Sequence, residues 1–192
     1  MITGVSFVDC DPAAHAPQML EIINVTIAQT TWIYDYAPRS LQAMERYVEQ
    51  RREAGFPVEC AVDAAGHLLG YGTFGTFRAL PAYRYTVEHS VFVAPRFRRQ
   101  GVGAQLLRRM IDLAVAGDYH TLVGVIDSSN RPSIALHERF NFALRATLRE
   151  VGYKHGRWLD ALVYQRVLET PESPSEPPSS DSAGSQPASS GS

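Results

Sequence analysis

The sequence predicts a single α/β domain, of the α+β kind, with a mixed and mostly antiparallel sheet flanked by helices. Segments whose apolar residues alternate with period two are interspersed with segments whose period is near 3.6. Helices between strands imply parallel pairing in the middle of the sheet, and hairpins imply antiparallel pairing elsewhere. The length of 192 residues, with 45% hydrophobic and 20% charged side chains, suits one ordinary soluble domain.

The chain opens with a predicted strand over residues 4–9 and two helices. Asp11 followed by Pro12 is typical of a helix start, since Asp caps free N–H groups and Pro lacks one. This first helix should run toward Thr30. A second helix is predicted over residues 40–55, beginning near a serine and ending at a glycine.

The middle of the chain predicts three strands, a helix and a further strand. Residues 58–63 and 68–77 are strands joined by a short Ala-Ala-Gly turn, which favours a hairpin. Residues 85–93 alternate most clearly between polar and apolar side chains. A helix over residues 103–116 carries apolar residues on one face, and residues 121–126 form an apolar strand.

A short helix over residues 132–140 and strands over residues 142–151 and 158–167 complete the unit. The predicted order is β-α-α-β-β-β-α-β-α-β-β, within a domain of residues 2–168. Residues 169–192 are almost entirely Ser, Pro, Gly, Ala and acids, a composition that cannot bury enough apolar surface to order itself. They are predicted to be a disordered tail.

Composition also excludes several classes of function. A net charge of -2 argues against nucleic acid as the main partner, although arginines cluster locally. The sequence has no apolar run of membrane-spanning length and no signal-peptide pattern, so a cytoplasmic location is expected. Cys10 and Cys60 lie in apolar, strand-like segments, where free cysteines are typically small buried hydrophobes. No cysteine or histidine spacing is typical of a metal site, so no metal is expected.

The most informative segment is VFVAPRFRRQGVGAQLLRRMIDLA, residues 91–114. A strand leads through a loop to Gly101 and Gly103, and a helix follows at once. Glycines at such a turn let the backbone approach a ligand, and the first N–H groups of the helix favour an anion. Arg98 and Arg99 add positive charge beside these groups. The alternative is a glycine turn with solvated arginines, since a lone Gly-x-Gly is a weak signal.

The run Arg98-Arg99-Gln100-Gly101-Val102-Gly103 resembles the Arg/Gln-x-x-Gly-x-Gly/Ala signature of the GNAT acetyltransferase superfamily, whose element order also matches. The resemblance implies that loop amides hold the pyrophosphate of acetyl-CoA, a co-substrate, and that the preceding strand pairs with its pantetheine arm. The implied coenzyme contacts are Val91, Phe92, Val93, Arg98, Arg99, Gln100, Gly101, Val102, Gly103, Ala104, Asn130 and Ser133.

Three further strings, YRYTVEHSVFV, VIDSSNRPSIALHERFNF and VGYKHGRWLDALVYQ, resemble one branch of this superfamily, the phosphinothricin and methionine sulfoximine acetyltransferases. The resemblance covers about residues 7–166. It implies an N-acetyltransferase that acts on the amine of a small amino-acid-like substrate and needs no metal. Residues 152–157 resemble a loop that reaches toward the partner's site in this branch, which implies a homodimer.

His137 is one of two implied catalytic residues. Most of the superfamily has a tyrosine here, thought to protonate the departing thiolate, whereas this branch has histidine. A lone helical histidine is more often structural, and a catalytic one serves as base or acid near neutral pH. Asn130 is implied to contact the coenzyme, but its position before a helix also suits a capping residue. Asn141 replaces the usual glycine and tolerates the same left-handed backbone.

Glu88 is the other implied catalytic residue. It lies in the middle of the strand over residues 85–93, where an acid is costly unless it is paired or functional. One interpretation is a salt bridge to an arginine. The other, implied by the resemblance, is a general base that deprotonates the substrate ammonium, directly or through water. A backbone N–H at Phe92 or Val93 is the expected donor to the developing oxyanion.

The substrate site is expected to use Arg78, Tyr83 and Arg84, since bidentate arginine suits an amino-acid carboxylate. Solvated surface arginines are the equal alternative. Asn24 and Thr31 belong to the implied acceptor pocket, in which Trp32 stands where a smaller residue is expected.

Two other functions stay open. One is acetylation of a protein N-terminus or a ribosomal protein, and the other is a non-catalytic acyl-CoA-binding module.

Overall fold

The structure, a computed structural model, describes residues 4–176 and contains the predicted elements in the predicted order. The strands are β1 (Ser6–Asp9), β2 (Val58–Val62), β3 (Leu68–Thr76), β4 (Thr86–Val93), β5 (Thr121–Asp127), β6 (Ala143–Lys154) and β7 (Arg157–Val167). The α-helices are α1 (Pro12–Gln29), α2 (Leu41–Glu53), α3 (Val102–Ala116) and α4 (Arg131–Arg139), with short 3₁₀ turns at Pro81–Tyr83 and Pro95–Phe97. The predicted fold class is therefore confirmed.

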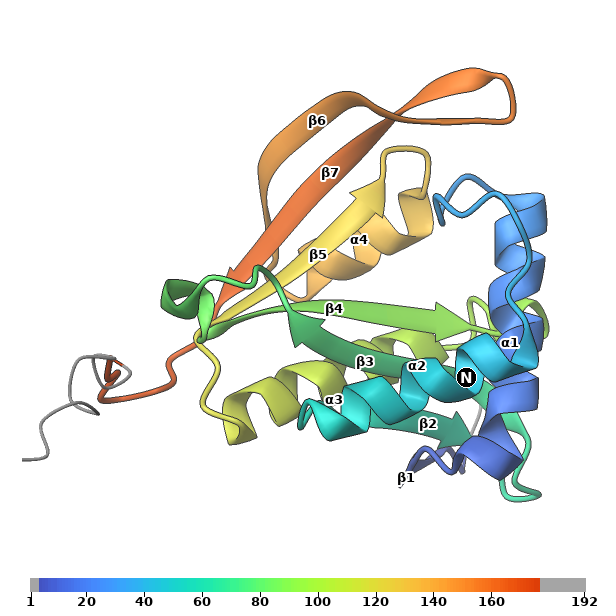
Figure 1. The fold of residues 1–192 in the computed structure, drawn as a ribbon, viewed down its shortest axis with the longest axis horizontal. Coiled ribbons are helices and arrows are strands. Elements are labelled where there is room, and N and C mark those ends of the chain that lie inside the picture. Colours follow the sequence, from blue (N-terminus) through green and yellow to red (C-terminus); the bar gives the residue numbers. More distant parts are fainter. Residues whose placement is uncertain (1–3, 177–192) are drawn as a thin grey trace, which may run out of the picture.

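Within residues 4–176, seven strands form one sheet in the order β1-β2-β3-β4-β5-β7-β6, and β4–β5 is the parallel pair among them. Helices α1 and α2 cover one face, and α3 and α4 cover the other (Figure 1). Two main apolar clusters fill the space between the helices and the sheet. One surrounds Tyr71 under α1 and α2, and the other surrounds Phe74 under α3 and α4.

Capping side chains set the starts of three helices. Asp11 accepts a hydrogen bond from the N–H of Ala13 at 3.1 Å, and Pro12 occupies the first position of α1. Ser40 accepts from the N–H of Ala43 at 3.2 Å at the start of α2. Each contact satisfies one of the N–H groups that the first turn of a helix leaves free. The helix starts predicted from the sequence are thus confirmed.

The parallel pair β4–β5 holds together over a short distance. Only three positions pair, from Thr86 opposite Thr121 to Glu88 opposite Val123, after which the strands diverge. Figure 1 shows β5 and the β6–β7 hairpin rising away from β4. The sheet is therefore split by a V-shaped opening whose vertex lies just after Glu88.

The β6–β7 hairpin is docked on the segment that joins α1 to α2. The buried ammonium of Lys154 donates to the carbonyls of Ile27 at 2.7 Å and Ile33 at 2.8 Å. The Tyr36 hydroxyl donates to the carbonyl of Tyr153 at 2.6 Å. These bonds join segments more than 100 residues apart in the chain and fix the far wall of the opening.

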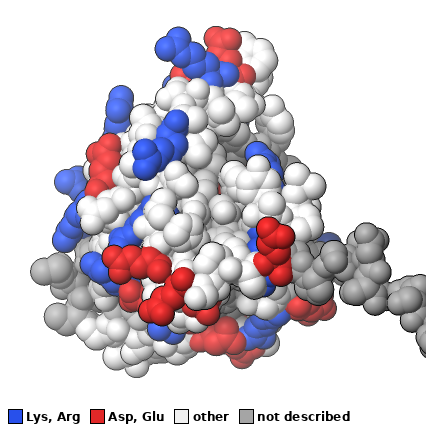
Figure 2. Space-filling model, turned by 90° about the vertical axis from the view of Figure 1, so that its left-hand side faces the viewer, with Lys and Arg blue, Asp and Glu red and all other residues white. Residues whose placement is uncertain are grey.

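The end of the described chain has no helix or strand beyond β7, but it is not free of contacts. The Thr170 hydroxyl donates to the carbonyl of Tyr119 at 2.7 Å, and Ser175 lies against the Tyr85 hydroxyl. Residues 177–192, most of the predicted tail, lie outside the described residues. None of the described helices combines the length and the apolar character that a membrane crossing requires. On the face in Figure 2, acidic and basic side chains are interspersed.

Candidate active site

The start of α3 forms an open cradle of backbone N–H groups. Gly101 adopts a left-handed conformation with φ 92°, and no side chain among the described residues caps the helix. The N–H groups of Val102, Gly103 and Ala104 therefore have no partner within the helix. A Cβ on Gly103 would lie 3.5 Å from both Leu136 and Val93, an ordinary contact. The protein itself does not require glycine there, so the missing side chain leaves room for a ligand that approaches the backbone.

The two loop arginines play different parts. The guanidinium of Arg98 is half-buried, donates to the Val93 carbonyl at 3.2 Å and lies 5.3 Å from the ring centre of Trp32. Arg98 therefore holds the loop against α1 through its Nε and Nη2 atoms. Arg99 is exposed and has φ 62°, an uncommon conformation for a residue other than glycine. Gln100 donates its side-chain amide to the Arg96 carbonyl at 2.8 Å.

The register of β4 decides which backbone groups face the opening. The N–H of Ala94 bonds to the carbonyl of Leu69 on β3, so the even-numbered residues of β4 point their backbone toward β3. The backbone of Phe92 is accordingly paired with β3. Val91 and Val93 point theirs toward β5, where the ladder has already ended. Of the two oxyanion donors expected from the sequence, only the N–H of Val93 faces the opening.

Glu88 lies half-buried at the vertex, on the face covered by α1 and α2. Burial raises the pKa of its carboxyl above the ordinary glutamate value, while the charges of Arg78 and Arg51 act against that shift. The Arg51 guanidinium lies over Gly75, the residue opposite Glu88 on β3. Among the described residues Glu88 takes part in no ion pair, so the salt-bridge interpretation is not supported.

His137 reaches the same vertex from the other face. Its Nδ1 lies 2.7 Å from the Ser133 carbonyl, and its Nε2 lies 3.2 Å from the Nε2 of His89. Burial lowers the pKa of His137, and the Ser133 carbonyl acts against that shift. Asn130 caps α4 by accepting from the Ser133 N–H at 3.2 Å, so the capping role is confirmed. His89 was not expected from the sequence.

The residues predicted to bind the substrate fall into two groups at opposite ends of the sheet (Figure 1). Arg78, Tyr83 and Arg84 lie on the β3–β4 connection, and of these Arg78 acts electrostatically on Glu88. The Arg84 guanidinium lies 4.8 Å from the ring centre of Tyr85. Arg78 therefore lies close enough to the vertex to act on Glu88. Tyr83 and Arg84 are exposed, and Arg84 contacts its neighbour in the chain, Tyr85.

The second group surrounds the connection between α1 and α2. The side-chain amide of Asn24 donates to the carbonyl of Arg39 at 3.0 Å and accepts from the N–H of Arg39 at 2.8 Å. Thr31 is buried and lies 3.3 Å from the Ser129 hydroxyl. Asn24 therefore shapes the segment, and Thr31 forms part of the wall of an adjacent cavity.

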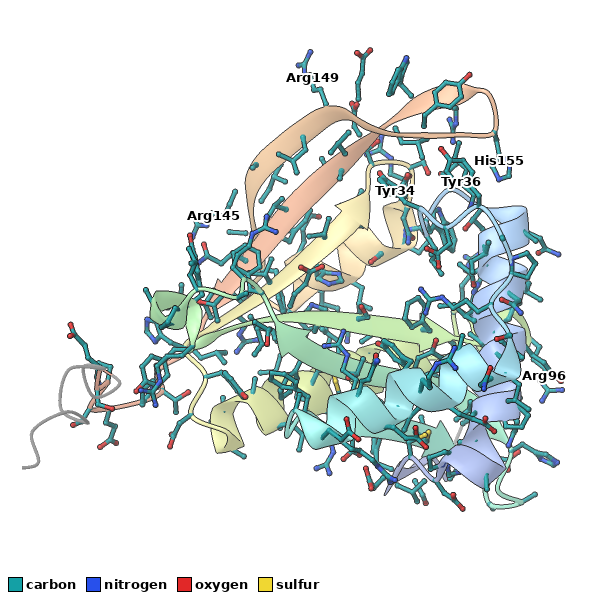
Figure 3. The ribbon with its side chains drawn as sticks, in the orientation of Figure 1. Tyr34, Tyr36, Arg96, Arg145, Arg149 and His155 are labelled. Atoms are coloured by element: carbon teal, nitrogen blue, oxygen red, sulfur yellow. The ribbon has the colours of Figure 1, made fainter. Side chains whose placement is uncertain are left out.

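This cavity has a volume of about 290 Å³ and lies between the α1–α2 segment, the end of β5 and the hairpin. Its lining includes Thr31, Trp32, Ser129, His155 and Arg157. Figure 3 shows Tyr34, Tyr36 and His155 gathered at this end of the molecule, whereas Arg96 points away from it. The burial of Tyr34, with the nearby Asp127, raises the pKa of its phenol to about 12.

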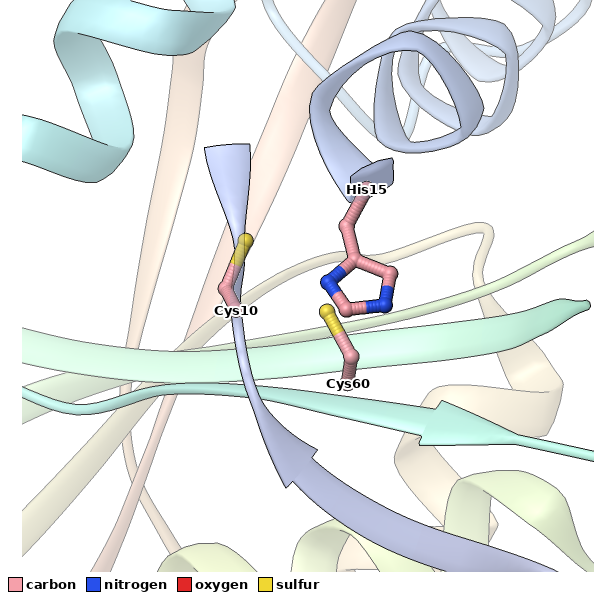
Figure 4. A group of neighbouring side chains, drawn as sticks. All are labelled: Cys10, His15 and Cys60. Carbon is pink, nitrogen blue, oxygen red and sulfur yellow. The ribbon is translucent and has the colours of Figure 1, made fainter. Parts of the chain in front are cut away.

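Cys10, His15 and Cys60 form a separate group at the start of α1, with potential metal ligands within 4.8 Å of one another (Figure 4). Two of these groups have contacts within the protein. The Nδ1 of His15 accepts from the N–H of Asp11 at 2.9 Å, and the Cys10 thiol lies 3.5 Å from the Met19 sulfur. Both cysteines are fully buried in the α1 cluster, as expected of small hydrophobes.

Comparison with known proteins identifies a family. The model of the "Acetyltransferase (GNAT) family" matches residues 23–142. An L-methionine sulfoximine/L-methionine sulfone acetyltransferase from Pseudomonas paraeruginosa is 39% identical over 156 residues, which cover 81% of this chain and 91% of that protein.

Two solved structures are also similar. A GNAT superfamily phosphinothricin acetyltransferase from Sinorhizobium meliloti, in complex with AcCoA, has a TM-score of 0.84 at 29% identity, covering 90% of this chain and 93% of that one. A ribosomal-protein-alanine N-acetyltransferase from Brucella melitensis has a TM-score of 0.82 at 35% identity, covering 85% and 99%.

Proposed function

Because the chain belongs to the GNAT acetyltransferase family, we propose that it transfers the acetyl group of acetyl-CoA to the amine of a small amino-acid-like substrate. Methionine sulfoximine and phosphinothricin, named in its relatives, are the reference acceptors. The single observation that carries the proposal is the V-shaped opening, which has free helix N–H groups at its wide end and Glu88 at its vertex.

The described residues around the start of α3 suit acetyl-CoA. The uncapped N–H groups of α3 suit a pyrophosphate, and Gly103 leaves the space that a Cβ would fill. Arg99 is exposed beside them and available for a phosphate. The backbone of Val91, which points toward the opening, can pair with the pantetheine arm. When bound, acetyl-CoA supplies an activated thioester carbonyl, and no metal is needed to polarise it.

Glu88 serves as the base in this proposal. A raised pKa makes its carboxylate a better proton acceptor than an ordinary glutamate, and the charges of Arg78 and Arg51 favour its ionised form. It takes the proton from the substrate ammonium on the α1–α2 face. The N–H of Val93 donates to the negative charge that develops on the carbonyl oxygen. Arg78, next to Glu88, is the best placed of the predicted carboxylate partners.

We also propose an oligomeric state and a cellular location. The chain forms a homodimer, since β6 and its neighbour β7 expose large apolar side chains, with 49% of Leu144, 44% of Leu148 and 61% of Trp158 exposed. It acts in the cytoplasm, where buried thiols such as Cys10 and Cys60 stay reduced. Sedimentation of the wild type and of Leu148→Glu tests the dimer, and a monomeric wild type contradicts it.

Release of free CoA thiol from acetyl-CoA tests the activity. The assay uses methionine sulfoximine, phosphinothricin, a peptide with N-terminal alanine, or no acceptor. We expect release with one or both small acceptors and none above background with the peptide. Release with the peptide alone favours the protein acetyltransferase, which the similar Brucella melitensis structure makes the second candidate. Binding of acetyl-CoA without release for any acceptor favours a non-catalytic module.

A further inference from the structure

A second buried histidine occupies the point where β4 and β5 part. The last paired positions of the two strands are Glu88 and Val123, so His89 and Gly124 are the first residues of the opening. The side chain of His89 points to the α3–α4 face, away from Glu88, and meets the imidazole of His137. Both rings are almost fully buried, with exposed fractions of 5% for His89 and 4% for His137.

The hydrogen bonds of His137 determine where the protons lie. A carbonyl can only accept, so the Nδ1 of His137, 2.7 Å from the Ser133 carbonyl, carries a proton. Burial lowers the pKa of both imidazoles, and a neutral imidazole has a single N–H. The Nε2 of His137 therefore holds a lone pair. Because the Nε2 of His89 faces it at 3.2 Å, His89 must be the donor of this bond.

The surrounding residues pack closely around these two rings. A Cβ on Gly124 would lie 2.9 Å from the Nε2 of His137 and 3.0 Å from that of His89, so β5 has room for the pair only because this residue is glycine. The Phe142 ring packs against both imidazoles, with centroids at 5.4 and 5.1 Å. Tyr164 approaches His137 from β7, and its hydroxyl donates to Glu138 at 3.0 Å.

Packing alone does not account for a histidine at position 89. Its Nδ1 is buried and has no hydrogen-bond partner among residues 4–176, which costs free energy. A leucine would fill a similar volume without that cost. The bond from its Nε2 to His137 is the interaction that leucine cannot make.

We propose that His89 is a positioning residue for acetyl transfer, which holds the orientation of His137 by donating its Nε2–H to the ring whose tautomer Ser133 sets. Ser133 holds one nitrogen of His137 and His89 holds the other, so the ring is fixed beside the vertex with Nδ1 protonated and the Nε2 lone pair accepting from His89. Gly124 provides the space for this pair. The inference rests on the proposed function, because it assigns His89 a part in that reaction.

Two substitutions test the role by kinetics. His89→Leu removes the donor and keeps the bulk, whereas His89→Gln keeps an N–H at similar reach. We expect kcat to fall by about 10- to 100-fold in His89→Leu, the cost typical of losing a group that orients a catalytic or ligating histidine. KM and the Kd for acetyl-CoA should stay unchanged, and His89→Gln should recover part of kcat. His67→Leu, at an exposed histidine on the β2–β3 turn, is the control.

The tautomer itself is measured without activity, by nitrogen-15 NMR of the imidazoles in the coenzyme-free wild type. We expect a proton on Nδ1 of His137 and on Nε2 of His89, and none on Nε2 of His137. In His89→Leu the Nδ1 proton of His137 should stay, and its Nε2 resonance should shift because the hydrogen bond from His89 is lost. A proton on Nε2 of His137 in the wild type, or full kcat in folded His89→Leu, overturns the proposal. A wild type that releases no thiol with any amine overturns the proposed function instead, and the spectrum distinguishes the two failures.

Discussion

Glu88 and His137 lie on opposite faces of the sheet and meet at the vertex between β4 and β5. Glu88 lies opposite Gly75 under α2, and His137 contacts His89 under α4. The two faces therefore offer separate approaches to one point. In the proposed reaction Glu88 acts on the amine from the α1–α2 face, and the pair of His137 and His89 lies on the α3–α4 face.

The substitution Glu88→Gln tests the base directly, because it keeps the size of the side chain and removes the proton acceptor. Turnover should fall by about 10²- to 10⁴-fold, the usual contribution of a general base. Burial raises the pKa of Glu88, so the acidic limb of the wild-type pH–rate profile should lie above the ordinary glutamate range. Turnover against pH for both proteins should show that limb only in the wild type.

Stability separates this role from a structural one. A carboxyl whose pKa is raised on folding stabilises the fold most at acid pH, and that contribution is lost as pH rises through the folded pKa. Glu88→Gln should therefore keep or raise Tm at neutral pH. A lower Tm with an unchanged pH profile indicates a structural ion pair, and a stable variant with near-normal turnover assigns the base elsewhere.

Arg51 should tune this base from α2. Its guanidinium lies over Gly75 and lowers the pKa of Glu88, so Arg51→Met should move the acidic limb of kcat toward higher pH. The methionine keeps an apolar contact with Tyr47, whose ring centre lies 5.3 Å from the guanidinium. Arg46→Met, on the exposed face of α2, is the control. An unshifted limb in Arg51→Met contradicts the electrostatic role.

The order of elements could be predicted from local patterns, because caps such as Asp11 and Ser40 and the period of apolar residues act within a few residues. The loop before α3 that is proposed to bind the coenzyme could also be predicted, from Gly101 and Gly103. Contacts between distant segments could not be predicted this way. Lys154 bonds to Ile27 across 127 positions, which no local pattern records.

The same limit applies to the site. Arg98 was expected beside an anion, and no local pattern indicated its contact with Thr26, 72 positions away. The pairing of His89 with His137 across 48 positions was missed, although the sequence held one signal. Gly124 interrupts an otherwise apolar strand, and a glycine there indicates a close approach by another group.

Gly103→Ala separates coenzyme binding from stability. An added Cβ meets only ordinary contacts at 3.5 Å, and alanine in a helix is favoured over glycine by up to about 1 kcal/mol, so Tm should stay or rise. The methyl group should weaken binding of coenzyme A by about tenfold or more, equivalent to about 1.4 kcal/mol. Isothermal titration measures the affinity, with the exposed helix change Val115→Ala as control. Unchanged affinity in folded Gly103→Ala and Gly103→Val contradicts the assignment of the loop.

Lys154→Met tests the docking of the hairpin. The variant leaves the carbonyls of Ile27 and Ile33 without their donor, which should cost about 1–3 kcal/mol of stability. A looser hairpin should raise KM for the amine while the Kd for acetyl-CoA stays the same, since the α3 cradle lies elsewhere. Arg149→Met, on β6 with its side chain pointing outward in Figure 3, should change neither. If the Kd for acetyl-CoA rises as much as the KM for the amine, the hairpin does not act on amine binding alone and the prediction is contradicted.

Gly124 and His89 should be energetically coupled, because the histidine ring occupies the space beside the glycine. Gly124→Ala places a methyl group against both imidazoles and should cost about 1–3 kcal/mol of stability, as overpacking typically does. His89→Ser removes one ring, so His137 gains room to move away from the new methyl group. Gly124→Ala should therefore be cheaper in the His89→Ser background, with a coupling of about 0.5–3 kcal/mol. Denaturant unfolding of the wild type, both single variants and the double variant measures it. The same cycle with His67→Ser, far from β5, should be additive, and additivity with His89→Ser would contradict the packing of both rings on Gly124.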